Sequence, residues 1–263
     1  MIIINNTIIE NNSYPDGTQK IDFIVPDLEK ITIEWYYEND TELFKVICLK
    51  RKIDEYDSSK KVSLYLPYLP NSRMDRVKNE SDVFTLKYFC EVINSLNFER
   101  VICYDIHSSV GAALLKNCEN RLPINEINAV INSLYDPNLV LCFPDEGAMK
   151  RYSDKLQRPY AFGVKKRNWE TGKIEGLSLI NGDKVVGKNV LIVDDICSYG
   201  GTFVHTAMAL KAAGANNIHL YITHCENNIL KGEVFKSNLF NSIYTMKTLP
   251  HCEELESKIG YVG

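Results

Sequence analysis

The sequence lacks a hydrophobic run that could cross a membrane, since no stretch approaches the roughly 20 apolar residues that a spanning helix needs. Residues 1–4 are apolar, but Asn5 and Asn6 end the run and no basic segment precedes it, which is not typical of a secretory signal. A basic excess is also absent, because 30 Lys and Arg residues stand against 34 Asp and Glu residues. We therefore expect no membrane anchor and no nucleic-acid partner.

Cysteines at metal-binding or redox spacing are missing as well. None of the 8 cysteines forms a CxxC pair, and Cys48, Cys103 and Cys142 lie in apolar runs, as small core residues of a reducing compartment do. Two His-Cys-Glu triplets, at residues 224–226 and 251–253, lack the spacing of zinc ligands, and we interpret their recurrence as coincidence. We expect a cytoplasmic protein.

The pattern of apolar residues predicts an α/β protein with two halves. Alternation over roughly the first 60 residues predicts strands, among them Leu43–Leu49, and little helix. Further along, short unbroken apolar runs alternate with helical periodicity, as in buried parallel strands joined by helices, and one helix is predicted at Asn228–Phe235. We predict two Rossmann-like domains, residues 1–134 and 135–263, with mainly parallel sheets whose carboxyl edges face each other across a cleft.

The most informative stretch is Asn189–Thr202, NVLIVDDICSYGGT. A buried strand ends there at two carboxylates, Asp194 and Asp195, and a glycine pair leads into a helix that begins at Thr202. Free backbone N–H groups at a helix N-terminus suit a phosphate, and carboxylates beside it suit ribose hydroxyls or a magnesium ion. A plain crossover with Thr202 as N-cap is the alternative, and the acidic pair, glycine pair and threonine together disfavour it.

This stretch resembles the loop that binds phosphoribosyl diphosphate (PRPP) in type I phosphoribosyltransferases and in PRPP synthetases (ribose-phosphate diphosphokinases). The resemblance implies that the ribose phosphate is bound by Asp194, Asp195, Ser198, Tyr199, Gly200, Gly201 and Thr202. The chain departs from the pattern at Ser198 and Tyr199, where the synthetases carry Asp-Thr around a terminal monophosphate. We interpret the ring of Tyr199 as a sign of an acceptor with a substituted 5′ phosphate, such as ADP-ribose, although a tolerated variation for ribose 5-phosphate is equally open.

Further stretches resemble the ATP side of the same synthetases, in the family's order. Residues 14–18, YPDGT, are similar to the F-x-D-G-E hairpin that a neighbouring subunit lends to the adenine, and residues 67–76 are similar to P-Y-x-x-Y-A-R-Q-D-R. Residues 105–108, DIHS, are similar to D-L-H-A/S. The resemblance implies an ATP site formed by Tyr14, Asp16, Arg73, Arg76 and His107, and a homodimer or larger homo-oligomer. Alone, residues 14–18 would be interpreted as a hairpin turn with Asp-Gly at its tip.

Two last stretches concern metal and catalysis. Residues 144–148 are similar to S-P-D-x-G-G, so the resemblance implies Mg²⁺ contacts from Asp145 and from His107, residues that alone would be interpreted as an N-cap and a structural histidine. Residues 164–168, VKKRN, are similar to D-K-R-R at the root of the synthetases' mobile loop. The resemblance implies that Lys165 and Arg167 are catalytic, whereas a solvated basic loop is the alternative.

The resemblance as a whole implies a Mg²⁺-dependent transfer of the β,γ-diphosphoryl group of ATP to the C1 hydroxyl of a ribose phosphate. Two other functions share some of the motifs. A type I phosphoribosyltransferase would use PRPP as donor and would not need Lys165, Arg167 or the ATP motifs. A non-catalytic, synthetase-like regulatory subunit would be expected to have lost mobile-loop residues that are present here.

Overall fold

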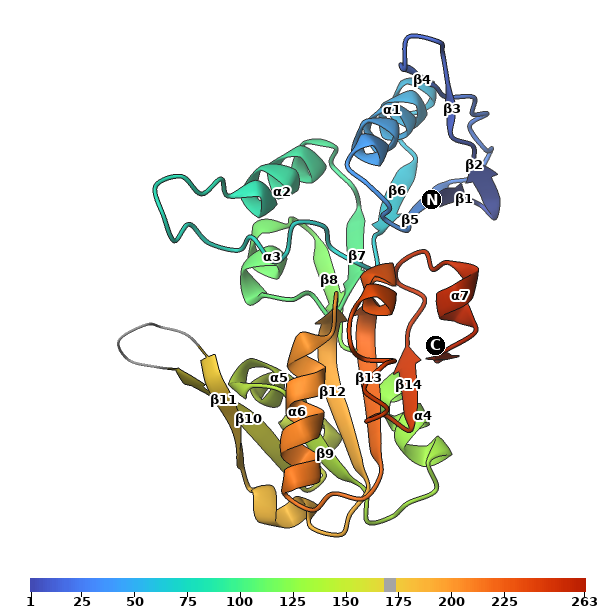
Figure 1. The fold of residues 1–263 in the computed structure, drawn as a ribbon. Coiled ribbons are helices and arrows are strands. Elements are labelled where there is room, and N and C mark those ends of the chain that lie inside the picture. The colour runs from blue at the N-terminus through green and yellow to red at the C-terminus, as the bar shows by residue number, and fades with distance from the viewer. Residues whose placement is uncertain (168–173) are drawn as a thin grey trace. The chain divides into compact units, whose positions relative to one another are not determined.

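The computed structural model describes residues 1–167 and 174–263, and the chain divides into two compact units (Figure 1). The first contains Met1–Leu122 with Thr248–Pro250, and the second contains Pro123–Lys247 with His251–Gly263. The domain boundary predicted between residues 134 and 135 stays a proposal; the division into compact units falls before that point, by the length of a single helix. Within the described residues no helix is both long and apolar enough to span a bilayer.

A six-stranded sheet organises the first unit, in the order β2-β1-β5-β6-β7-β8. Its strands are β1 (Ile2–Ile4), β2 (Thr7–Ile9), β5 (Lys30–Trp35), β6 (Lys61–Tyr65), β7 (Arg100–Tyr104) and β8 (Cys118–Arg121). The last four run parallel to one another, and β1 joins β5 and β2 antiparallel. A separate small hairpin consists of β3 (Asn12–Ser13) and β4 (Gln19–Lys20).

Three helices belong to this unit: α1 (Thr41–Tyr56), α2 (Thr85–Ser95) and α3 (Ser109–Leu114). Helix α1 corrects the sequence-based prediction of a strand at Leu43–Leu49. Its buried apolar residues Val46, Leu49 and Ile53 have helical spacing. Two lysines of the same helix, Lys45 and Lys50, are buried as well. Because these polar residues take buried positions on the helix, the apolar residues alone do not show a clear helical pattern, and the segment was mistaken for a strand.

A seven-stranded sheet organises the second unit, in the order β11-β10-β9-β12-β13-β14-β15. Its strands are β9 (Val140–Phe143), β10 (Tyr160–Arg167), β11 (Ile174–Ile180), β12 (Val190–Cys197), β13 (Ile218–Cys225), β14 (Ser242–Thr245) and β15 (Gly260–Tyr261). Only the β10–β11 pair among these is antiparallel. The predicted α/β fold with mainly parallel sheets is therefore confirmed.

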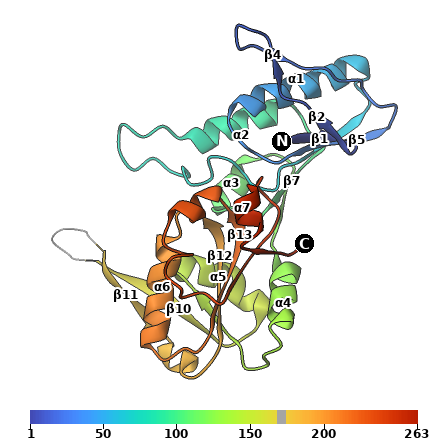
Figure 2. The same cartoon turned by 45° about the vertical axis from the view of Figure 1, so that its right-hand side comes forward.

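Helices bury both faces of this sheet, which explains the unbroken apolar run of β12. The helices are α4 (Ile124–Ser133), α5 (Glu146–Leu156), α6 (Gly201–Ala212) and α7 (Glu253–Glu256), and Figure 2 shows them from a second side. Val190 and Ile192 of β12 share one core cluster with Phe203 of α6. The alternate residues of β12 are equally buried, and on α5 the ring of Tyr152 stacks on that of Phe143, with 6.2 Å between centroids.

The helix predicted at Asn228–Phe235 is wrong, because the chain forms only a short 3₁₀ turn, η2 (Asn227–Lys231), there. The buried apolar residues of this stretch, Ile229 and Val234, are five positions apart and do not share a helical face. After the turn Gly232 is extended, with φ −85° and ψ −165°, which ends the helical geometry.

The end of the chain is held by a partly buried histidine, His251. The imidazole Nε2 of His251 donates to the carbonyl oxygen of Cys225 at 2.7 Å, so Nδ1 accepts from the hydroxyl of Tyr261 at 2.6 Å. The two rings are also stacked, with centroids 5.6 Å apart. Burial lowers the pKa of His251, while the bond to Cys225 opposes that shift. The folded protein therefore favours the neutral form of the His251 imidazole.

Acidification is expected to destabilise the second unit through His251. Because its pKa is lower when folded than when unfolded, the unfolded chain takes up the proton first, and stability falls as the pH drops below about 6.5. Urea unfolding at pH 7.5 and pH 5.5 measures this loss. His251→Gln retains a donor toward Cys225 and should show a smaller loss than the wild type; an equal loss in both proteins would contradict the assignment.

Candidate functional site

The acidic pair predicted from the sequence lies near the end of β12. Asp195 is buried and its Oδ2 pairs with the guanidinium of Arg151 on α5 at 2.9 Å. The backbone N–H of Asp195 donates to Oδ1 of Asp194 at 3.0 Å. One carboxylate is therefore committed to an internal ion pair, while Asp194 is only partly buried and is the better placed of the two to bind a ligand.

The carboxyl of Asp194 lies in surroundings that favour a cation. Burial raises its pKa well above the usual range, and the negative charges of Asp195 and of Asp145 raise it further. Two aspartates from different elements, Asp145 at the start of α5 and Asp194 in β12, thus influence each other electrically. A bound cation would relieve this repulsion, because it stabilises the ionised carboxylates.

The residues after β12 form the loop at which a phosphate was predicted. Gly200 has φ +77°, a left-handed conformation that glycine adopts without strain, and α6 begins directly after it. Gly201 and Thr202 are exposed in the first turn of this helix. The aromatic side chain of Tyr199 is 57% exposed, so its ring is free to meet a ligand rather than fill the core.

A second segment, which contains Gly232 and Val234, packs closely against this loop. A Cβ atom added to Gly232 would lie 1.9 Å from the carbonyl oxygen of Tyr199, and one added to Gly200 would lie 2.2 Å from Cγ2 of Val234. Since the φ of Gly232 is an ordinary −85°, its backbone does not demand glycine, but the close approach to Tyr199 does. The segment from η2 to Val234 therefore packs directly against residues 198–200, the loop between β12 and α6, which we call the acceptor loop.

In the first unit the fold brings together two loops that are distant in the sequence. Arg76, in the loop after β6, donates from Nε to Oδ1 of Asp75 at 2.8 Å and from Nη2 to Oδ2 at 3.1 Å. Arg76 contributes most to lowering the pKa of Asp75, and Ser108 and the nearby His107, from the loop after β7, lower it further. Arg73 is an exposed residue of the first of these loops.

The hairpin with Tyr14 and Asp16 is built differently. The Oδ1 atom of Asp16 accepts from the N–H and the hydroxyl of Thr18, at 3.0 and 2.7 Å, and these bonds lower the pKa of Asp16. The aromatic ring of Tyr14 is 53% exposed. The hairpin is hydrogen-bonded to α1, whereas the loops around His107 follow β6 and β7. The residues predicted to bind ATP therefore come from separate elements of the first unit.

The structure offers oxygen ligands for a magnesium ion but no ready-made cage. Asp145 is the N-cap of α5, where its Oδ1 accepts from the N–H of Ala148 at 3.1 Å. Within residues 1–167 and 174–263 no group of three or more His, Cys, Asp or Glu side chains could hold an ion. Mg²⁺ is typically bound by one or two carboxylates together with substrate phosphates, and Asp145 and Asp194 fit that need.

The catalytic residues predicted at positions 165 and 167 belong to β10, whose register with β11 shifts between Lys166 and Arg167. Their side chains lie outside the described portion of the structure. The sequence analysis missed two residues, namely Arg151, which pairs with Asp195 in the second unit, and Asp75, which pairs with Arg76 in the first. The Arg-x-Asp-Arg pattern of residues 73–76 was a signal for Asp75. The pairing of Arg151 with Asp195 depends on how α5 packs on β12 and could not be seen in the sequence.

Comparisons with known proteins agree with this architecture. Residues 124–241 match the phosphoribosyl transferase domain family. A ribose-phosphate pyrophosphokinase of Pyrococcus abyssi is 30% identical over 221 residues, which are 82% of this chain and 75% of that protein. The Pyrococcus furiosus protein of the same name is 29% identical over 83% of this chain and 78% of its own length.

The chain belongs to the ribose-phosphate pyrophosphokinase family. It is therefore an enzyme of the diphosphokinase type. A phosphoribosylpyrophosphate synthetase from Mycobacterium smegmatis has the same fold, with a TM-score of 0.78 at 17% identity over 97% of this chain and 85% of that one. The family resemblance and the α/β fold with two domains are therefore confirmed, and the two domains are of the phosphoribosyltransferase type.

Proposed function

We propose that the protein transfers the β,γ-diphosphoryl group of ATP to the anomeric C1 hydroxyl of a ribose phosphate. The C1 oxygen forms a bond to the β-phosphorus, and the bond from that phosphorus to the oxygen bridging the α- and β-phosphates breaks. AMP leaves with this bridging oxygen, and the hydroxyl proton is released. The observation that carries the proposal is the sequence of elements around the acidic pair: Asp194 lies in the buried strand β12, which ends at Cys197, and the Gly200 turn then leads into α6. The names of the relatives, ribose-phosphate pyrophosphokinases, support it.

Each group of residues has a role in this proposal. Asp194 binds the ribose hydroxyls, and the backbone N–H groups of Gly201 and Thr202 bind the 5′ phosphate at the start of α6. The ion pair with Arg151 holds Asp195 in place beneath them. Tyr14 and Asp16 bind the adenosine moiety of ATP, while Arg73, Arg76 and His107 meet its phosphates. Lys165 and Arg167 stabilise the charge that develops on the phosphoryl oxygens.

We include Mg²⁺ in the proposal, with Asp145 and His107 as the protein contacts that the resemblance implies. When bound with ATP, the ion neutralises phosphate charge. The raised pKa of Asp194 supports such an ion, because crowded carboxylates that lack a cation favour protonation.

The acceptor is either ribose 5-phosphate or a ribose with a substituted 5′ phosphate, and one observation favours the second. The ring of Tyr199, at the position next to the phosphate loop, is 57% exposed. An aromatic ring there can stack on a group attached to the 5′ phosphate, such as the adenosine of ADP-ribose. A bare monophosphate gains nothing from such a ring.

Incubation with Mg-ATP and each acceptor, followed by AMP release and product mass, tests the proposal. We expect turnover with an acceptor, and Tyr199→Ala should lower kcat/KM for ADP-ribose about tenfold while leaving that for ribose 5-phosphate within about twofold. Equal rates with both acceptors in wild type and variant would refute the role of Tyr199. Base transfer from PRPP without ATP turnover would instead identify a phosphoribosyltransferase.

A further inference from the structure

The β3–β4 hairpin projects from the first unit into solvent. Every residue from Glu10 to Thr18 is exposed. The hairpin is nevertheless well bonded internally, through the β3–β4 pairing and through the N–H of Tyr14, which donates to the carbonyl oxygen of Thr18 at 2.8 Å. Because the hairpin is bonded internally, the contacts at its root set the direction in which its tip points.

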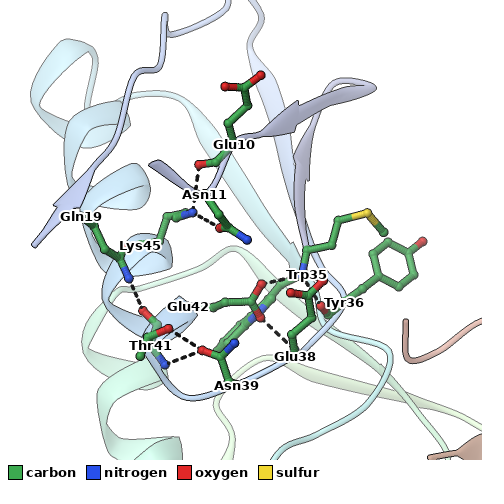
Figure 3. Close-up of polar contacts among 11 residues, drawn as sticks. Glu10, Asn11, Gln19, Trp35, Tyr36, Glu38, Asn39, Thr41, Glu42 and Lys45 are labelled. Atoms are coloured by element: carbon green, nitrogen blue, oxygen red, sulfur yellow. Dashed lines mark hydrogen bonds and ion pairs between the residues drawn. The ribbon is translucent and has the colours of Figure 1, made fainter. Parts of the chain in front are cut away.

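A buried lysine of α1 holds the first strand of the hairpin at that root. The ammonium Nζ of Lys45 donates to the carbonyl oxygen of Glu10 at 3.0 Å and to the side-chain oxygen of Asn11 (Figure 3). The side chain of Lys45 is only 2% exposed. Removing an ammonium group from water is costly, and hydrogen bonds such as these offset the cost.

The second strand of the hairpin is tied to the same helix. The amide Nε2 of Gln19 donates to the carbonyl oxygen of Thr41, the first residue of α1, at 2.8 Å. Helix α1 is itself firmly placed, because the buried carboxylate of Glu42 accepts from the indole Nε1 of Trp35 and from the N–H of Glu38, both at 2.8 Å (Figure 3). Helix α1 is thus hydrogen-bonded to both ends of the hairpin, at Glu10 and Asn11 before β3 and at Gln19 in β4.

A cavity lies beside the root. Glu10, Asn12 and Asp22, which flank or begin the hairpin in the chain, line this cavity of about 450 Å³. The space next to β3, the first strand of the hairpin, is therefore open and is not filled by packed side chains. Without the ammonium group of Lys45, the carbonyl of Glu10 and the amide of Asn11 would lose the donor that fixes this strand.

We propose that Lys45 is a positioning residue that sets the direction of the β3–β4 hairpin and thereby the affinity of the enzyme for ATP. The inference rests on the proposed function in one respect, namely that Tyr14 and Asp16 at the hairpin tip bind the adenosine moiety of ATP. Lys45 acts through the hairpin and touches neither substrate.

A matched pair of variants tests this role in the full-length protein. Lys45→Met removes the ammonium group and retains the length of the side chain. Lys50→Met is the control, because Lys50 lies on the same helix, is 4% exposed, and bonds to Asp54 instead of the hairpin, at 2.6 Å. Two measurements are made on both variants and on the wild type: amide hydrogen exchange of residues 10–20, and steady-state kinetics for ATP and for the acceptor.

We expect Lys45→Met to speed exchange in residues 10–20 and to raise KM for ATP about tenfold, with kcat and the acceptor KM within about twofold, because a bond from a charged donor is worth an effect of that size. Lys50→Met should change neither measurement. Unchanged exchange in Lys45→Met would overturn the positioning role, and faster exchange with an unchanged KM for ATP would overturn the link to ATP. Absence of ATP turnover in the wild type would refute the proposed function alone, since exchange would still decide whether Lys45 fixes the hairpin.

Discussion

Arg167→Ala is expected to lower turnover by about a thousandfold while ATP still binds. In diphosphoryl transfer the negative charge shifts onto the phosphoryl oxygens of the transition state, and a cation aimed at them contributes little to ground-state binding. Losses of about this size follow removal of an arginine that performs this task in phosphoryl-transfer enzymes. AMP formation under saturating Mg-ATP measures turnover, and calorimetric titration measures ATP affinity.

The control for this experiment is the adjacent residue. Lys166→Ala removes a positive charge from the same strand, β10, but from a position to which no role is assigned. If Arg167 acts as a catalytic group, Lys166→Ala should retain most of the activity. Unchanged turnover in Arg167→Ala would point to a non-catalytic, synthetase-like subunit instead, and comparable losses in both variants would mean that only the overall positive charge of the loop matters.

Gly232→Ala is expected to reduce kcat/KM for the acceptor by about a hundredfold, although Gly232 touches no substrate in the proposed mechanism. The added Cβ would lie 1.9 Å from the carbonyl oxygen of Tyr199, and because that oxygen belongs to the backbone, the loop must move. A displacement of about 1 Å in groups that orient a substrate can cost a factor of this size. Steady-state kinetics with varied acceptor and varied ATP separate the two effects, and KM for ATP should not change.

Flanking substitutions make this result specific. Lys231→Ala and Glu233→Ala alter exposed residues on either side of Gly232 and should leave the acceptor kinetics unchanged. Urea unfolding of Gly232→Ala shows whether the whole unit has been destabilised, since a global defect would lower activity at every acceptor concentration. Wild-type kinetics in Gly232→Ala would mean that the loop accommodates the methyl group and that the segment after η2 does not support it.

The sequence predicted the second unit better than the first, for a physical reason. Strands such as β12 are covered by helices on both faces, so their apolar runs are unbroken and easy to recognise. Helix α1 was mistaken for a strand because Lys45 and Lys50 occupy buried positions, where their polar contacts, in the case of Lys45 to residues distant in the sequence, decide the structure. The short strand β8 was missed because its sequence, CENR, has almost no apolar residue.

The candidate site shows the same division. Asp194, Gly200 and Tyr199 could be proposed from the sequence because local chemistry and a family motif coincide in one stretch of the chain. Arg151 was missed because its role comes from an ion pair between a helix and a strand that are far apart in the sequence. Gly232 left a similarly weak signal, since its importance is a close approach to another backbone and not a turn of its own.

The strand order of the second unit also determines when its strands can assemble during synthesis. The interior strand β9 can pair with β10 as soon as one helix has followed it. Its other neighbour is β12, so Val140 cannot pair with Val190 until about 50 more residues have been made. Until then β9 has an unpaired apolar edge on the growing chain, a condition that promotes aggregation. The yield of folded protein in a cell should therefore depend on translation speed and on chaperones that cover this edge.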